Sequence, residues 1–169
     1  LEPLVAVAER GVPVFLVLGN HERSRIRLHL WTVHPLLHIF DRPRMFTLRL
    51  GDGDGPTLAL SGFPAVGGNV RDLFTARLEE TGWRHVAADA RLLCMHEVVA
   101  GAQVGDTNYT FRSGPQVIRG EDVPGDFGAV LSDHIHRAQV LRRDLEGRPL
   151  AAPVVYPGAI ERTAFVERL

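Results

Sequence analysis

The sequence predicts an α/β fold, in which short buried strands alternate with amphipathic helices. Three mainly apolar runs, 14–18, 91–95 and 128–131, have the length of strands buried on both faces of a helix-covered sheet. The segments 1–10 and 70–80 have the apolar spacing of amphipathic helices. Polar residues directly follow each of the three runs, at the strand end where open α/β sheets place their ligands.

The N-terminal segment is predicted to be a helix followed by a strand. The helix runs from Leu1 to about Arg10 and ends at Gly11, and Pro13 begins the strand at 14–18. The chain starts with leucine rather than methionine, and its first residues already follow a helical pattern. We therefore expect it to begin inside a domain, with a processed or trimmed terminus as the alternative.

The first candidate functional residues, Asn20 and His21, come just after this strand. Gly19 allows the chain to turn sharply, which places both side chains at the carboxyl end of the strand. An asparagine oxygen is a hard metal ligand, and a histidine binds metal or transfers protons near neutral pH. The alternative is a polar turn without function. The basic stretch at 22–31 is predicted either to contact phosphates or to be a solvated face.

Strand and turn signals continue along the chain. The run 36–40 is apolar, and 45–50 alternates between apolar and polar residues as a half-buried strand does. The turn composition at 52–56 then leads to the apolar run 57–60, which predicts a β-hairpin. Further strands are expected at 138–145, 150–156 and 160–169.

The segment 101–125 is rich in glycine and proline and has few periodic apolar positions. It is predicted to be a long surface loop with at most a short helix, and loops of this length are usually functional or mobile. Tyr109, Phe111 and Arg112 lie within it. Their side chains either stack on a nucleobase or cover the hydrophobic core.

Two further strands end in histidine. The run 91–95 leads to His96, which is either functional or satisfied by backbone hydrogen bonds. The run 128–131 leads to His134 and His136, and residues two apart in extended chain point the same way at about 7 Å separation. Both imidazoles can therefore converge on one site, and two metal ions about 3.5 to 4 Å apart would suit the pair.

These ligand types also predict which ions could bind. Imidazole and amide ligands favour manganese, iron or zinc over magnesium. Four neutral ligands do not offset the charge of two divalent ions, so a dinuclear site needs carboxylates as well. Asp133, Glu97 and Asp106 are the candidates within this chain.

Composition excludes several classes of protein. The chain has 169 residues, of which 45% are hydrophobic and 23% charged, with a formal net charge of -1, so any contact with nucleic acid has to be local. No apolar run is long enough for a membrane span, and no signal peptide is recognisable. The single cysteine, Cys94, lies in an apolar run and is expected to be buried, which fits a cytoplasmic protein.

Three motifs together resemble a known family. Gly19-Asn20-His21-Glu22, the strand-terminal His96 and Asp133-His134-Ile135-His136 are similar, in order and spacing, to the later motifs of calcineurin-like metallophosphoesterases. The stretch 156–165 resembles the DNA repair exonuclease branch, the nuclease subunit of SbcCD-type complexes. The resemblance implies a two-sheet β-sandwich flanked by helices, with four layers in the order αββα.

The resemblance also implies roles for the candidate residues. Asn20, His96 and His134 would bind one divalent ion, His136 would bind the second, and His21 would protonate the leaving group. The ions are expected to be manganese, with iron or zinc as alternatives. The implied function is a metal-dependent phosphoester hydrolase, specifically a DNA exonuclease or phosphodiesterase with a coiled-coil ATPase partner.

The sequence also departs from the family pattern. The opening motifs, Asp-x-His and Gly-Asp-x-x-Asp, are absent, so residues 1–169 are expected to form a single, N-terminally incomplete domain covering about the C-terminal two-thirds of the family core. No capping domain is expected, and Ser132-Asp133 replaces the usual glycine before the His-x-His motif. The alternatives are a phosphatase or cyclic-nucleotide phosphodiesterase of the same fold, and a non-catalytic binding module or inactive fragment.

Overall fold

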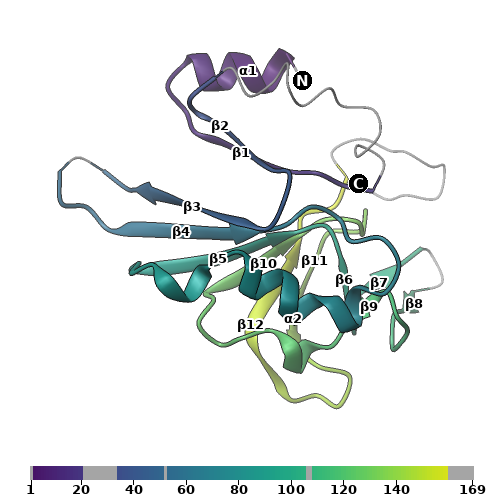
Figure 1. Cartoon of the computed structure of the whole chain (residues 1–169). Helices are drawn as coiled ribbons and strands as arrows, with labels where there is room; N and C mark the ends of the chain where they lie inside the picture. Colours follow the sequence, from purple (N-terminus) through teal and green to yellow (C-terminus); the bar gives the residue numbers. More distant parts are fainter. Residues whose placement is uncertain (1, 21–33, 52, 106–107, 160–169) are drawn as a thin grey trace.

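The computed structural model describes residues 2–20, 34–51, 53–105 and 108–159 (Figure 1). This part of the chain is an α/β structure made mostly of strands. In chain order its elements are α1 (Glu2–Glu9), β1 (Val14–Val17), β2 (Leu37–Phe40), β3 (Arg44–Arg49), β4 (Thr57–Gly62), α2 (Val70–Glu80), the 3-10 helix η2 (Trp83–His85), β5 (Ala90–Met95), β6 (Val98–Val99), β7 (Gln103–Val104), β8 (Tyr109–Thr110), β9 (Val117–Ile118), the 3-10 helix η3 (Gly120–Asp122), β10 (Ala129–Ser132), β11 (Gln139–Arg143) and β12 (Pro149–Tyr156).

The main sheet has six strands in the order β11-β12-β10-β5-β4-β3. Its four inner strands are parallel, and the edge strands β3 and β11 run antiparallel to their neighbours. Met95 at the end of β5 is the register partner of Ser132 at the end of β10. The residues that follow, His96 and Asp133, therefore leave the sheet next to each other.

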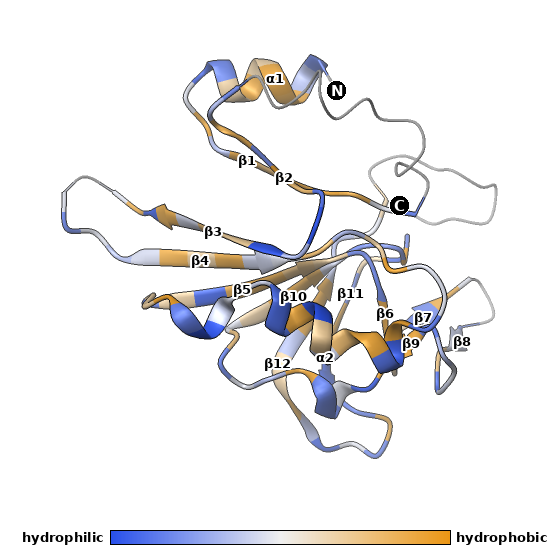
Figure 2. Ribbon diagram, viewed as in Figure 1, coloured by the Kyte–Doolittle hydropathy of each residue, from blue (hydrophilic) through white to orange (hydrophobic). Residues whose placement is uncertain are grey.

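Both faces of this sheet are covered by apolar residues. On one face lies the largest hydrophobic cluster, to which α2 contributes Val70, Phe74 and Leu78. The opposite face packs against the parallel pair β1–β2, and α1 packs on the far side of that pair through Val5. Apolar residues accordingly concentrate in the strands and on parts of both helices in Figure 2. No helix in the described segments is long and apolar enough to cross a membrane.

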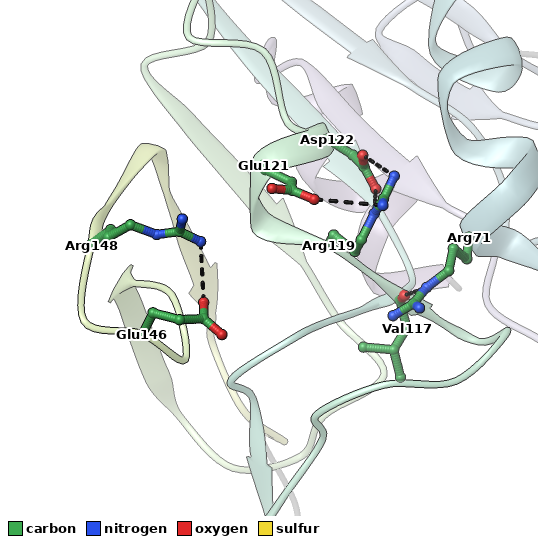
Figure 3. A network of polar contacts seen from close by, with 7 residues as sticks. All are labelled: Arg71, Val117, Arg119, Glu121, Asp122, Glu146 and Arg148. Carbon is green, nitrogen blue, oxygen red and sulfur yellow. Dashed lines mark hydrogen bonds and ion pairs between the residues drawn. The ribbon is translucent and has the colours of Figure 1, made fainter.

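A set of polar contacts holds the elements that follow β5 (Figure 3). The Nε–H of Arg71 in α2 donates to the carbonyl of Val117 in β9 at 3.0 Å, and β9 pairs with β6. Arg119 forms two hydrogen bonds with Asp122, and these bonds raise the pKa of its guanidinium. Because β6 starts two residues after His96, the Arg71–Val117 bond braces the chain beyond that histidine through the β6–β9 pair.

Most of the predicted elements are confirmed. The helix α1, the β3–β4 hairpin, α2, β5 and the hairpin of β11 and β12 lie where the sequence predicts them. Cys94 is buried as expected, and burial raises the pKa of its thiol to about 12. The tail strand predicted at 160–169 and the basic stretch at 22–31 fall outside the described residues.

Two predictions are wrong. The strand at 14–18 is not buried on both faces: all four residues of β1 are half-buried, because β1 pairs only with β2 among the described strands. The segment 101–125 is not simply a surface loop. It contains β7, β8, β9 and η3, and its Val117, Ile118 and Val123 lie in the main hydrophobic cluster. These runs of apolar residues are too short for a periodicity to be recognised in the sequence.

Candidate functional site

The candidate site lies where β1, β5 and β10 end. The carbonyl of Leu18, directly after β1, accepts a hydrogen bond from the backbone N–H of Ala65 at 2.8 Å. Ala65 lies in the segment after β4, so this bond fixes the end of β1 beside the main sheet. Asn20, two residues further on, is thereby held near the end of β5 although the two strands belong to different sheets.

Asn20 and His96 are in direct contact. Nε2 of His96 lies 3.0 Å from Oδ1 of Asn20, within hydrogen-bond distance, across 76 residues of sequence. The side chain of His96 is only 13% exposed, whereas Asn20 lies at the surface. The contact therefore lies at the rim of the sheet. The protein surrounds the ring of His96, and the side chain of Asn20 is accessible from solvent.

His134 lies against the ring of His96. The two ring centroids are 5.1 Å apart and the rings meet edge to face, at an interplanar angle of 85°. The backbone of His134 has a φ of 83°, in the left-handed region that residues other than glycine seldom adopt. Such strain tends to occur at functional sites. Three of the candidate ligands, Asn20, His96 and His134, are thus brought together.

Asp133 approaches the other nitrogen of the His96 ring. Its Oδ2 is 3.6 Å from Nδ1 of His96, and its backbone N–H donates to the carbonyl of Met95 at 3.3 Å. Asn20 and Asp133 therefore contact opposite sides of the same imidazole. A carboxylate on this side of an imidazole attracts the Nδ1–H electrostatically, which favours the tautomer whose Nε2 can bind a metal.

The donor atoms fit a cation. Nε2 of His96 and Oδ1 of Asn20 are 3.0 Å apart, an ordinary hydrogen-bond distance that is also the separation of two ligands each about 2.1 Å from one ion at a right angle. In the described segments, no three His, Cys, Asp or Glu side chains form a metal-binding group by themselves. Asn20 is not one of these residue types. The candidate ligand set therefore consists of the histidines together with the side-chain amide of Asn20.

Glu97, another candidate carboxylate, has a different position. Its side chain is buried, and Oε1 accepts the backbone N–H of Val66 at 2.5 Å. This bond attaches the segment after β4 to the end of β5, next to the Ala65–Leu18 bond. Glu97 therefore helps to set the position of Asn20 relative to His96.

A buried network of hydroxyl groups fixes the backbone of Glu97. Oγ of Ser132 donates to the carbonyl of Glu97 at 2.7 Å and accepts its N–H at 3.2 Å. The hydroxyl of Tyr156 donates to the same carbonyl at 3.2 Å and accepts the N–H of Val99 at 2.8 Å, and burial raises the pKa of this phenol. Sequence reasoning did not predict these contacts. The only signal was their place at the ends of apolar runs.

His136 lies at the surface two residues beyond His134. Its carbonyl accepts the N–H of Ala159 at 3.0 Å, so the segment after β12 holds its backbone. Gly158 makes this close approach feasible. It has a φ of 81°, and a Cβ there would lie 2.8 Å from the nitrogen of Ala138 and 3.0 Å from the carbonyl of His136.

Replacement of Gly158 by alanine is expected to displace the His136 segment. Gly147 is a matched control, because its φ is 82° but no atom lies within 4 Å of a Cβ placed there. Gly147→Ala should lower the free energy of unfolding by about 1 to 2 kcal/mol through backbone strain alone. Gly158→Ala should cost about 1 to 3 kcal/mol more because of the clash. Urea denaturation of both variants measures the difference, and equal losses would contradict the proposed packing.

The other candidates are outside the described residues. These are His21, the expected proton donor, and Asp106, the third candidate carboxylate. The same holds for 160–165, the last part of the stretch that resembles the exonuclease branch.

In comparisons with known proteins, no family model matches the chain and no curated protein matches it.

Proposed function

We propose that this chain is a metal-dependent phosphoester hydrolase, most specifically a DNA exonuclease or phosphodiesterase with a dinuclear site. The observation that carries the proposal is the contact between Asn20 and His96, with His134 packed on the same ring. These residues come from three segments that are distant in sequence. Neither core packing nor helix capping accounts for an exposed amide held on a nearly buried imidazole.

The arrangement of the layers supports the proposal. α1 packs on the β1–β2 pair, this pair packs on the six-stranded sheet, and α2 packs on the opposite face of that sheet. This order is the one that a four-layer αββα metallophosphoesterase sandwich requires. We propose that β1 and β2 belong to the second sheet of such a sandwich, within a single domain.

Each residue has a role in the proposed reaction. Asn20, His96 and His134 hold one divalent ion and His136 the other, with manganese expected and iron or zinc as alternatives. When bound, such ions supply Lewis-acid activation of water and of the phosphoryl group. His21 donates a proton to the leaving oxygen, and Asp133 orients His96 through Nδ1.

A panel of substrates tests the proposal. The purified chain, loaded with manganese and analysed for metal content, is assayed on bis(4-nitrophenyl) phosphate, on 4-nitrophenyl phosphate and on end-labelled single-stranded DNA. Hydrolysis of the diester and of DNA is expected. Hydrolysis of the monoester alone would favour a phosphatase over a nuclease as the function of this chain. Fewer than two ions per chain, with no hydrolysis, would reject the enzyme in favour of a binding module.

A further inference from the structure

Tyr109, at the start of β8, has an exposed aromatic ring. It is 59% exposed, and its ring meets that of Phe111 edge to face, with centroids 5.2 Å apart and an interplanar angle of 89°. Phe111 packs against the main hydrophobic cluster. Of these two aromatic residues, therefore, Phe111 covers the core and Tyr109 does not. The inner ring supports the outer one, whose free surface faces solvent.

A hollow in the surface lies beside this ring. Its volume is about 370 Å³, and its lining consists of Asn108, Tyr109, Thr110, Arg112 and Ser113. The hollow is shallow and open to solvent, so it would contact a ligand along one face rather than enclose it. The lining combines one aromatic ring and one guanidinium with neutral polar groups, which suits a planar base attached to a phosphate.

Two arginines flank the hollow. Arg112 lines it, and the guanidinium of Arg137 donates to Oδ1 of Asn108, which is also part of the lining. Within the described residues, no carboxylate forms an ion pair with either arginine. The positive charge here is therefore local, on a chain whose formal net charge is -1.

The β7–β8 hairpin is tied to the His-x-His segment. Arg137 directly follows His136 in sequence. Two reciprocal bonds join Gln139 to β7: its Oε1 accepts the N–H of Gln103 at 2.9 Å, and its Nε2–H donates to the carbonyl of Gln103 at 2.8 Å. Figure 1 shows β7 and β8 at the end of the main sheet where β5 and β10 terminate.

We infer that β8 and the residues that flank it, 108–113, bind single-stranded nucleic acid. The Tyr109 ring stacks on a base, and Arg112 and Arg137 contact the neighbouring phosphates. Stacking on one aromatic ring is tolerant of sequence, and arginines beside it follow the backbone. This inference rests in part on the proposed function, since it names the substrate class that the nearby histidines would cleave.

Binding of fluorescein-labelled oligo(dT) tests the inference by anisotropy, in the presence of EDTA so that no cleavage occurs. Tyr109→Ala is expected to weaken binding about 5- to 150-fold, and Tyr109→Phe to keep it within about twofold, because stacking needs the ring rather than the hydroxyl. Arg112→Ala and Arg137→Ala should each reduce the slope of log affinity against log salt by about 0.7. Since Tyr109 is exposed, its replacement does not empty the core.

Arg49→Ala is the matched control for charge. Arg49 is an exposed arginine on β3, in the hairpin at the opposite end of the main sheet (Figure 1), and its loss should leave the affinity unchanged. Equal affinity of Tyr109→Ala and the wild type would overturn the inference, as would an equal loss in Tyr109→Phe and Tyr109→Ala.

The two proposals fail separately. If the wild type with manganese hydrolyses bis(4-nitrophenyl) phosphate but binds oligo(dT) independently of Tyr109, the hairpin site is wrong and the hydrolase stands. If Tyr109 governs oligo(dT) binding and no phosphoester is hydrolysed, the hairpin site stands and the hydrolase is wrong.

Discussion

Replacing His96 with alanine is expected to abolish manganese binding at the first ion site and, with it, hydrolysis of phosphodiesters. His96 contacts Asn20 through Nε2 and Asp133 through Nδ1, and its ring packs edge to face with the ring of His134. Its loss removes the group that unites the other three. Loss of an outer-shell partner typically costs about 10- to 100-fold in metal affinity, so removal of a ligand itself should cost more than about 100-fold.

Calorimetric titration with manganese measures this effect directly, without relying on turnover. His85→Ala is the matched control, because His85 is an exposed histidine in η2. His96→Gln serves as a second variant that keeps much of the side-chain volume, so that a general loss of folding can be recognised by circular dichroism. Wild-type affinity in a folded His96 variant would remove this residue from the metal site.

Replacing His21 with alanine is expected to keep the metal and lose most of the rate. As general acid, His21 would contribute about 10² to 10⁴ in turnover. The loss should be largest for a diester with a poor leaving group, which needs the proton most. It should be smallest for bis(4-nitrophenyl) phosphate, whose leaving group is stable as an anion.

The rates of hydrolysis of the two diesters, measured together with manganese affinity, distinguish a general acid from a metal ligand at position 21. Manganese affinity in His21→Ala should equal that of the wild type, whereas His96→Ala loses it. His85→Ala again controls for the removal of an imidazole. Unchanged turnover of the poor-leaving-group diester would exclude His21 from proton donation, and a parallel loss of metal would make it a ligand instead.

Local sequence patterns predicted much of the fold. The apolar runs that became β4, β5 and β10 and the helical spacing of α2 each depend on a few adjacent residues. Proximity of His96 to the His134 segment could also be predicted, because both follow parallel strands at the same edge of a sheet. The observed register, with Met95 opposite Ser132, agrees with this reasoning.

Long-range contacts could not be predicted in the same way. The bonds from Ser132 and Tyr156 to Glu97 span 35 and 59 residues, and nothing in the local pattern pairs these positions. The short strands β6 and β9 have two residues each, a single period of the strand pattern, which is too short to recognise. The half-buried state of β1 depends on its neighbours in space rather than on its own apolar residues.

The left-handed backbone of His134 implies a trade-off between durability and activity. A residue with a β-carbon pays about 1 to 2 kcal/mol for this conformation, a cost that glycine escapes. Laboratory evolution towards heat resistance alone would thus favour losing the imidazole here. A metal-binding role of the kind proposed for His134 would offset this cost in stability by a gain in activity.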